Sequence, residues 1–285
     1  MNDNIIESYN IITSRQNPSV IFACNLLDKK HRQKENKFRF DGIKLFREAM
    51  ISGVEIETAF VMKSKSEKIF SIIGDFLTNA TVGGFDIKVV EDGVFEKISE
   101  EKSPEGIVCV AKNIDKFHKI GKIKYEYLES ILRSDARIFA LESLRDPGNL
   151  GTIIRSSVAF GVDCLFVSSD CAEIYNPKTI RATMGTIFRQ KIIAVDDLAD
   201  VIKLSSKFDR KTYAATLSDN AFLLGKTELS NRDCIVIGNE GHGLSDSVIN
   251  ACDESILIPM TPNAESLNAA IASSICMWEQ FGRNL

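Results

Sequence analysis

The segment ARIFALESLRDPGNLGTIIRSSVAFG (residues 136–161) joins an apolar run, a Gly-rich turn and an amphipathic pattern. The uninterrupted apolar run is typical of a buried strand in a parallel sheet. After the turn, Leu150, Ile153, Ile154 and Val158 recur at helical spacing and form one apolar stripe, with Arg155 off that stripe. A strand followed at once by a helix is the building unit of α/β proteins. The segment therefore predicts an α/β fold.

The Gly-rich turn resembles a nucleotide-binding loop but does not complete a phosphate-binding fingerprint. Gly148 and Gly151 supply only GxxG, and isoleucines occupy the region of the third glycine that a dinucleotide loop needs. The chain also contains no GxxxxGK[ST] motif. We therefore predict Asn149 as the N-cap of a helix. Arg155 is then either an ordinary surface residue or part of another kind of site.

Strand-like and helix-like segments alternate through the rest of the chain. Residues 1–112 indicate a compact α/β unit, and residues 136–285 indicate a second unit in which six strands alternate with helices. Between them, residues 113–135 are rich in lysine and are expected to form a connector that is partly helical. Alternation of this kind predicts a parallel sheet with helices on both faces.

Composition places the chain among ordinary globular proteins. It has 285 residues, of which 44% are hydrophobic and 26% charged, and no apolar run approaches the roughly 20 residues needed to cross a bilayer. Its first residues, MNDNIIESYN, lack the basic and apolar regions of a signal peptide. The seven cysteines are odd in number and show no CxxC spacing, which disfavours a disulfide framework or a metal site. We therefore expect reduced thiols, no metal and a cytoplasmic location.

The net charge of −4 does not by itself indicate a nucleic-acid partner, but basic residues gather near the start of the chain. Between Arg15 and Glu48, nine Lys or Arg oppose four acids, a local excess of five. A solvated face is the plain explanation of such a cluster. If the chain binds RNA, the best candidates for phosphate contacts are Arg15, Lys29, Lys30, Arg32, Lys37 and Arg39.

Two later segments indicate a ligand site at the carboxyl ends of strands. CIVIGNEGHGLSD (residues 234–246) runs a buried strand into three glycines within six residues, which indicates positive φ angles or close approach of a ligand. ILIPMTPNAESLNAAIASS (residues 256–274) ends a strand at Pro259 and opens a helix at Glu265 and Ser266. Ligands of open α/β sheets bind at such strand ends, and helix N-termini bind anions. A tight turn and an ordinary helix cap are the alternatives without a ligand.

Three segments together resemble the motifs of the SpoU-type (TrmH-like) RNA 2′-O-ribose methyltransferases: NLGTIIR (149–155), IGNEGHGL (237–244) and IPM…ESLNAAIA (258–272). Their order and spacing make the resemblance specific, and it covers nearly the whole chain. Three further segments are similar to the family's substrate-binding domain or to the stretch between its first two motifs: FRFDGIKLFREAMISG (38–53), SPEGIVCVAK (103–112) and NPKTIRATMGTIFRQKI (176–192).

The resemblance implies a parallel-sheet α/β domain with a deep C-terminal trefoil knot, although threaded chains are otherwise rare. It implies an RNA-binding α/β domain over residues 1–112, a linker over 113–135 and the methyltransferase domain over 136–285. It also implies S-adenosylmethionine as cofactor, RNA as partner, and a homodimer formed through the knot domain. The residues expected to contact the cofactor are Thr216, Leu217, Gly238, Glu240, Gly241, Ile258, Met260, Leu267 and Ala269.

The reaction implied is methyl transfer to a ribose 2′-hydroxyl. In the family, the arginine that matches Arg155 is viewed as the residue that activates this hydroxyl. Because a guanidinium has a pKa above about 12, we favour a charged Arg155 that stabilises the developing alkoxide and binds the adjacent phosphate. The family does not require His242, which we treat as a loop residue. The catalytic candidates are Arg155, Asn149, Glu240, Ser266 and Asn268.

Several readings of the function stay open at this point. Asp41 stands where the family commonly has Glu, and Glu105 where Gln is frequent, so the identity of the RNA is in doubt. Ribosomal RNA of the 23S type is favoured because a full substrate-binding domain precedes the knot domain, with transfer RNA as the alternative. A non-catalytic RNA-binding or ribosome-assembly protein is disfavoured by Arg155, Asn149 and Asn268. The missing phosphate loop disfavours a small-molecule nucleotide enzyme.

Overall fold

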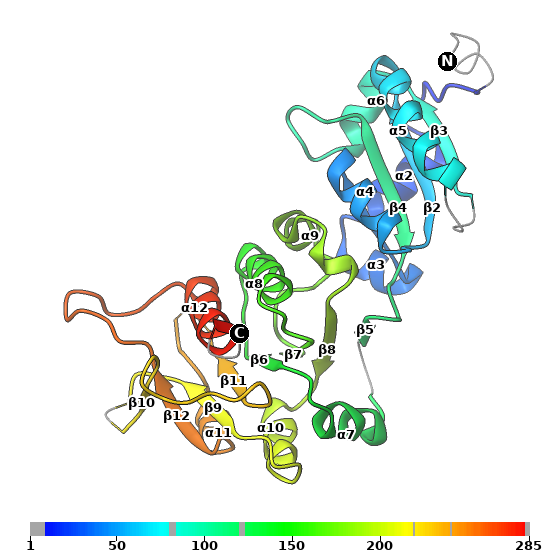
Figure 1. The fold of residues 1–285 in the computed structure, drawn as a ribbon. Helices are drawn as coiled ribbons and strands as arrows, with labels where there is room; N and C mark the ends of the chain where they lie inside the picture. Colours follow the sequence, from blue (N-terminus) through cyan, green and yellow to red (C-terminus); the bar gives the residue numbers. More distant parts are fainter. Residues whose placement is uncertain (1–8, 80–83, 120–122, 219, 240, 283–285) are drawn as a thin grey trace. The chain divides into compact units, whose positions relative to one another are not determined.

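The computed structural model describes residues 9–79, 84–119, 123–218, 220–239 and 241–282. The chain forms two compact units, which Figure 1 colours along the sequence. The first unit contains the chain up to Ile114 together with Tyr175–Phe188. The second contains Asp115–Ile174 and the chain from Arg189 onward.

The second unit is built on one sheet in the order β10-β12-β9-β11-β6-β7-β8-β5, and its recorded strand pairs are all parallel. Its central strands β6 (Ile138–Leu141) and β11 (Cys234–Ile237) are buried throughout, which explains why they appear in the sequence as uninterrupted apolar runs. The parallel sheet predicted from the alternation is confirmed. The other strands are β5 (His118–Lys119), β7 (Cys164–Ser168), β8 (Lys191–Val195), β9 (Thr212–Ala215), β10 (Phe222–Leu223) and β12 (Glu254–Leu257).

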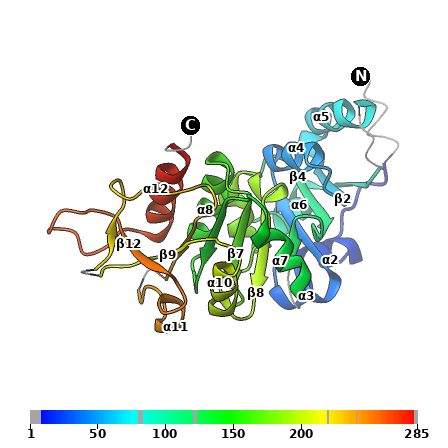
Figure 2. The same ribbon diagram turned by 60° about the horizontal axis from the view of Figure 1, so that its bottom comes forward.

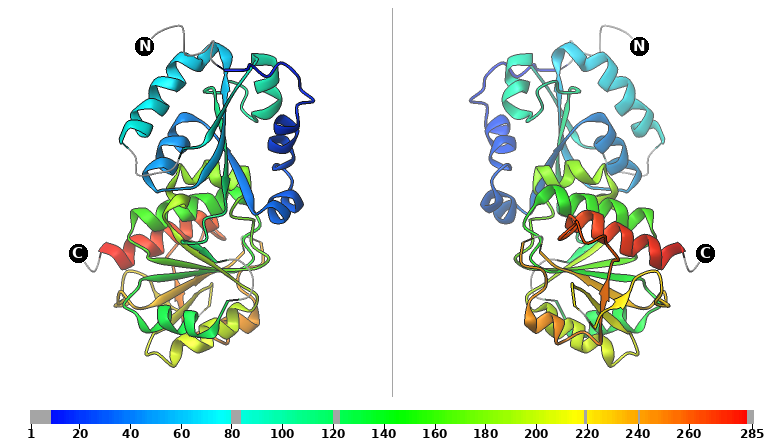
Figure 3. Two further views of the ribbon diagram at one scale, coloured as in Figure 1. Left: turned by 90° about the vertical axis from the view of Figure 1, so that its right-hand side faces the viewer. Right: turned by 90° about the vertical axis from the view of Figure 1, so that its left-hand side faces the viewer.

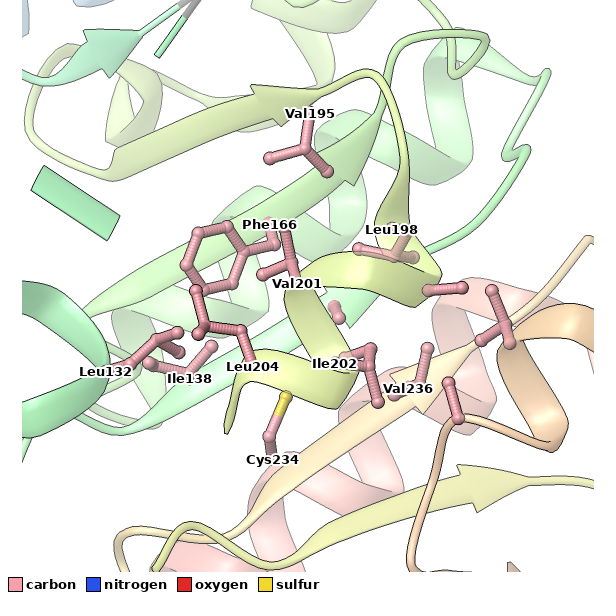
Figure 4. Close-up of a cluster of buried hydrophobic side chains, with 14 of the residues drawn as sticks. Leu132, Ile138, Phe166, Val195, Leu198, Val201, Ile202, Leu204, Cys234 and Val236 are labelled. Carbon is pink, nitrogen blue, oxygen red and sulfur yellow. The ribbon is translucent and has the colours of Figure 1, made fainter. Parts of the chain in front are cut away.

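Helices cover both faces of this sheet (Figure 3). On one face, Leu132 and Ile202 of two helices join Phe166 and Val236 of the strands in an apolar core (Figure 4). Val248 of a third helix belongs to the same core. On the other face, two helices lie side by side (Figure 1) and are joined by a hydrogen bond between hydroxyl groups. The first face carries α7 (Tyr125–Arg133), α10 (Leu198–Ser206) and α11 (Asp246–Ile249), and the second carries α8 (Pro147–Ala159) and α12 (Ala269–Gly282).

The first unit has a smaller mixed sheet in the order β1-β4-β2-β3, in which only β2 and β3 run parallel. Two of its helices, α2 and α6, lie beside β2 and β4 (Figure 2), and Val20, Phe60 and Phe95 pack together there. Its elements are α2 (Pro18–Asn25), α3 (Lys29–Glu35), β1 (Lys37–Asp41), α4 (Ile43–Ile51), β2 (Ile56–Met62), η1 (Lys63–Lys65), α5 (Ser66–Asn79), β3 (Asp86–Val90), α6 (Asp92–Ile98), β4 (Ile107–Lys112), α9 (Pro177–Thr183) and η2 (Thr186–Phe188).

The compact units divide the chain differently from the segments 1–112, 113–135 and 136–285. The segment Tyr175–Phe188 belongs to the first unit because of aromatic packing. The ring of Tyr175 stacks on that of Phe38 with centroids 4.5 Å apart, and the rings of Phe188 and Phe40 lie 5.2 Å apart. The backbone N–H of Ile114 also donates to the Tyr175 hydroxyl at 2.7 Å. A segment expected in the second domain therefore completes the core of the first unit.

The expected connector is likewise part of a folded unit. Strand β5 pairs with β8 at one edge of the large sheet. Helix α7 places Ile131 and Leu132 in the core of the second unit. The partly helical character predicted for residues 113–135 is confirmed by α7.

Candidate active site

A pocket of about 430 Å³ opens at the carboxyl ends of β9, β11 and β12. This is the edge at which open α/β sheets bind ligands, and the volume falls within the range of roughly 300–1,000 Å³ that is usual for ligand sites. Of the nine residues predicted to contact a cofactor, Glu240 lies outside the described residues. The other eight all line the pocket: Thr216, Leu217, Gly238, Gly241, Ile258, Met260, Leu267 and Ala269.

The Gly-rich segment after β11 forms a tight loop in the pocket wall. Two main-chain hydrogen bonds of 3.0 Å close it between Asn239 and Gly243. A side chain at Gly238 does not fit, because its Cβ would lie 2.3 Å from the carbonyl carbon of Gly243. Gly243 itself has a φ of 68°, a conformation that favours glycine. The compact shape of the loop thus accounts for two of its three glycines.

Asn239 organises this loop, although it was not among the residues predicted for the site. Its amide oxygen accepts hydrogen bonds from the backbone N–H groups of Gly241 at 2.8 Å and His242 at 3.2 Å. Its amide nitrogen donates to the carbonyl oxygen of Ser143 at 2.8 Å. A polar residue between two glycines at a strand end was the available signal in the sequence. His242, treated as an ordinary loop residue, also lines the pocket.

The N-cap of helix α8 lies about one turn earlier in the chain than the sequence predicted. Its N-cap is Asp146, whose carboxylate accepts a hydrogen bond of 2.7 Å from the backbone N–H of Asn149. Proline is favoured at the first helical position, so the pair Asp146–Pro147 fixes the start of the helix. The prediction of Asn149 as N-cap is therefore wrong. Asn149 lies within the first turn, and its side chain has a partner outside the helix.

That partner is Asn268, at the start of α12. The Asn268 amide nitrogen donates to the amide oxygen of Asn149 at 3.0 Å. The Asn268 oxygen accepts from the N–H groups of Ala270 at 2.9 Å and Ile271 at 3.3 Å, which makes Asn268 the cap of α12. The helix therefore starts later than the expected Glu265 and Ser266, both of which lie in the preceding loop and line the pocket.

Arg155 lies on α8, nearly two turns after Asn149. Its side chain is exposed and does not line the pocket. In the described part of the chain, its guanidinium forms no ion pair. The next residue, Ser156, shares a hydrogen bond of 2.8 Å with Ser274 of α12. The structure thus brings Asn149, Asn268 and Ser266 to the pocket region and presents Arg155 to solvent on the adjoining helix.

Two of the six basic residues proposed for RNA contacts are buried in the first unit. Arg32 is 3% exposed and donates to the carbonyl oxygens of Leu26 and Leu27 at 2.7 Å each. Arg39 is 1% exposed and pairs with Asp41 at 2.9 Å. Both arginines stabilise the fold and are not accessible to RNA phosphates, so their candidacy is corrected. The sequence shows that each arginine is positively charged. It does not show the carbonyl and carboxylate groups that bind the guanidinium inside the folded unit.

The other four basic candidates lie nearer the surface. Lys29 and Lys30 are exposed at the start of α3. Arg15 is exposed and donates to the carbonyl oxygen of Gly93 at 2.9 Å. Lys37 forms an ion pair of 2.6 Å with Glu57. Lys29 and Lys30 are therefore the candidates best placed to contact an RNA backbone.

The two departures from the family pattern have structural roles in the first unit. Besides Arg39, the carboxylate of Asp41 accepts the Ser99 hydroxyl at 3.0 Å and the Glu100 N–H at 3.2 Å. The carboxylate of Glu105 accepts the N–H of Ile43 at 2.5 Å, at a helix start that has no side-chain cap of its own. Both carboxylates therefore stabilise the first unit by accepting hydrogen bonds inside it.

The cysteine side chains are buried or half-buried. The seven cysteines are free. Burial raises the pKa of Cys164, Cys252 and Cys276 to about 12, so these groups are protonated at neutral pH. Among the residues that the structure describes, no group of three His, Cys, Asp or Glu is placed to bind a metal. The described helices include none with the length and apolar character needed to span a membrane.

A parallel sheet with a ligand pocket at its carboxyl edge, accompanied by a smaller mixed-sheet unit, defines a two-domain α/β protein with a cofactor-type site. The chain belongs to the SpoU rRNA methylase family, whose model matches residues 136–278. A model of the MRM3-like substrate-binding domain matches residues 17–109. The family resemblance of the three motifs is thereby confirmed.

Individual relatives match along nearly their full length. The 23S rRNA (guanosine(2553)-2′-O)-methyltransferase RlmP of Bacillus subtilis is 27% identical over 271 residues, covering 95% of this chain and 99% of that protein. An uncharacterized tRNA/rRNA methyltransferase of Synechocystis sp. is 28% identical over 271 residues, covering 94% of this chain and 92% of that protein. The crystal structure of an AdoMet-bound rRNA methyltransferase from Sinorhizobium meliloti superposes with a TM-score of 0.79 at 26% identity, covering 97% of this chain and 99% of that chain.

Proposed function

We propose that this protein transfers a methyl group from S-adenosylmethionine to a ribose 2′-hydroxyl of ribosomal RNA. The observation that carries the proposal is the hydrogen bond of 3.0 Å between Asn149 and Asn268. It joins the first and third motifs beside the pocket, and the second and third motifs both contribute to the pocket wall. The full-length similarity to a 23S rRNA 2′-O-methyltransferase supports the reaction and the class of RNA. Transfer RNA is the alternative substrate.

The pocket fits a nucleoside cofactor. Apolar side chains of Ile258 and Leu267 suit the faces of an adenine ring, and main-chain groups of the surrounding loops suit its polar edge. Thr216 and Ser266 add hydroxyl groups to the wall. When bound, S-adenosylmethionine supplies a methyl group on a positively charged sulfur. We assign the remaining contacts to Leu217, Gly238, Glu240, Gly241, Met260 and Ala269.

Arg155 acts on the RNA substrate, at the ribose 2′-hydroxyl and a neighbouring phosphate. An arginine side chain carries a fixed positive charge in proteins. A fixed positive charge stabilises the alkoxide as the 2′-hydroxyl loses its proton, and its forked donors bind a neighbouring phosphate. A phosphate oxygen or water takes the proton, and the methyl carbon exchanges its bond to the cofactor's sulfur for one to the 2′-oxygen. Asn149, Ser266 and Asn268 orient the ribose or Arg155, and Glu240 supports the Gly-rich loop.

Three finer features complete the proposal. The C-terminal part of the second unit forms a trefoil knot around the pocket, as the family resemblance implies. The protein is a homodimer through this unit, because Ile271 and Trp278 of α12 are 51% and 55% exposed and offer an apolar surface to a second copy. The first unit binds the RNA, and the protein works in the cytoplasm, where its thiols stay reduced.

Methyl transfer from labelled S-adenosylmethionine to purified RNA tests the function. We expect label in ribosomal RNA, and loss of one 2′-O-methyl site when total RNA is mapped in cells without this gene. Label in transfer RNA alone would identify transfer RNA as the substrate in place of ribosomal RNA. Cofactor binding by calorimetry without label in either RNA would favour a non-catalytic RNA-binding protein, and absence of both would overturn the proposal.

A further inference from the structure

Ser143 adopts an unusual backbone conformation between β6 and α8. Its φ is 54°, in the left-handed region that favours glycine. A residue with a Cβ reaches this region only when its surroundings hold it there. Ser143 lies in the short connection from β6 to the helix that carries Asn149 and Arg155. What holds Ser143 therefore bears on the geometry of the active site.

One carboxylate holds Ser143 in two ways. The Ser143 hydroxyl donates to one oxygen of Asp170 at 2.6 Å. The Ser143 backbone N–H donates to the Ser168 hydroxyl at 2.8 Å, and that hydroxyl donates to the other oxygen of Asp170 at 2.6 Å. The guanidinium of Arg145 lies 2.9 Å from the same carboxylate. Burial acts to raise the pKa of Asp170, but the two hydroxyl donors and Arg145 lower it on balance, so Asp170 is charged at neutral pH.

The other side of Ser143 faces the Gly-rich loop. Its carbonyl oxygen accepts the hydrogen bond of 2.8 Å from Asn239. Asn239 in turn binds the N–H groups of Gly241 and His242, which line the pocket. The direction of the Ser143 carbonyl depends on its backbone angles. The left-handed conformation of Ser143 is therefore coupled to the position of the pocket wall.

We propose that Asp170 is a positioning residue for the cofactor pocket, which holds Ser143 in its left-handed conformation so that the Ser143 carbonyl anchors Asn239 and the Gly-rich loop. Asp170 does not line the pocket and acts through Ser143. The inference rests on the proposed function, because it takes the pocket to bind S-adenosylmethionine. It adds a residue outside the three motifs to the machinery of the site.

Two substitutions of Ser143 separate the effect of its backbone conformation from the effect of its hydroxyl group. Ser143→Ala and Ser143→Gly both remove the hydroxyl, but only alanine keeps a Cβ that disfavours positive φ. We expect Ser143→Ala to weaken S-adenosylmethionine binding about tenfold, which corresponds to about 1.4 kcal/mol. Ser143→Gly keeps the affinity within about twofold. Calorimetry measures both, and thermal unfolding shows that each variant is folded.

Substitution of Asp170 extends the test. Asp170→Ala weakens cofactor binding about tenfold, and adding Ser143→Gly restores it to within about threefold, because glycine needs no partner to hold this conformation. Rescue of this kind does not follow from a general loss of stability. Asp253→Ala is the matched control: its carboxylate accepts the Thr212 N–H and hydroxyl at 2.8 Å each, at the opposite end of β9 from the pocket. The control keeps the affinity of the unmodified protein.

The outcomes distinguish this inference from the proposed function. Equal affinities for Ser143→Ala and Ser143→Gly would overturn the inference alone, as would additive losses in the double variant. If Asp170→Ala does not fold, the two Ser143 variants decide the matter. Absence of S-adenosylmethionine binding by the unmodified protein would overturn the proposed function together with the inference.

Discussion

A hydrogen bond of 3.0 Å joins the side chains of Asn149 and Asn268, although 119 positions separate them in the sequence. Each lies at the start of a helix, and the two helices pack side by side. Because Asn268 also caps α12, a single residue fixes the start of one helix and its distance from the other. The first and third motifs are thereby held together in one geometry.

Two variants of Asn268 separate its role as the cap of α12 from its hydrogen bond to Asn149. Asn268→Ala removes both roles, and we expect the free energy of unfolding to fall by about 1 kcal/mol, as is typical for loss of an N-cap. Asn268→Asp caps as well as asparagine but has no N–H to donate to Asn149, so it keeps the stability and lowers methyl transfer. Chemical denaturation and transfer of labelled methyl groups measure the two effects. Full activity in Asn268→Asp would show that the bridge is dispensable.

Replacement of Arg155 tests its role toward the RNA. Arg155→Lys keeps the charge but loses the forked donors, and we expect kcat to fall about 10²–10³-fold. S-adenosylmethionine affinity and thermal stability stay unchanged, because Arg155 is exposed and outside the pocket wall. Arg133→Lys on α7 is the control and keeps full activity. Wild-type kcat in Arg155→Lys would refute the assigned role.

A side chain at Gly238 is expected to disrupt the pocket. The Cβ of Gly238→Ala would lie 2.3 Å from the backbone of Gly243, so the loop has to open. We predict loss of S-adenosylmethionine binding and a lower melting temperature. Gly74→Ala, on helix α5 with nothing within 4 Å of the added Cβ, is the matched control and raises stability by about 0.5–1 kcal/mol. Normal cofactor binding by Gly238→Ala would contradict the loop geometry.

Alkaline pH should destabilise the protein through its buried thiols. Burial raises the pKa of Cys276 to about 12 in the folded protein, against about 8.5 for an unfolded cysteine. Stability from this group is therefore full below about pH 8.5 and is lost as the pH rises toward 12, by about 1.4 kcal/mol per pH unit. Cys276→Ala should show a shallower alkaline slope by that amount. An unchanged slope in denaturant titrations from pH 8.5 to 10.5 would exclude this contribution.

Exposed lysines of the first unit are expected to contribute to RNA affinity through phosphate contacts. Replacing both Lys29 and Lys30 by Ala should weaken RNA binding and reduce the slope of log affinity against log salt by about 0.7 per lysine for single-stranded RNA. Lys68→Ala, also exposed in the first unit but outside the basic cluster, is the control. An unchanged salt slope in the double variant would place the phosphate contacts elsewhere.

The sequence was sufficient to predict features that depend on local pattern. The apolar runs that became β6 and β11 have continuous hydrophobic character because both of their faces are covered. The pocket residues Gly238 and Leu267 were found because the family motifs keep a fixed order along the chain. For the two strands the information lies within a few neighbouring residues, and for the pocket residues it lies in the order of the motifs.

Features that depend on distant partners were not predictable in the same way. Arg39 appeared to be a surface cation, but Asp41 and the carbonyl oxygen of Ala23 hold it inside the first unit. The sequence gives no sign that Asn149 accepts a hydrogen bond from Asn268, because that contact forms only when two helices pack. Ser143 gave no signal at all, since serine rarely adopts a positive φ.

The placement of Tyr175–Phe188 has a consequence for how such proteins can be divided and recombined. The backbone crosses between the two compact units three times, near positions 114, 174 and 188. Removal of the chain up to Lys112 would take away Phe38 and leave the rings of Tyr175 and Phe188 without this aromatic partner. Substrate-recognition units therefore cannot be exchanged between relatives at one junction. A working chimaera has to exchange two separate pieces of chain together, the long N-terminal piece and this short internal one.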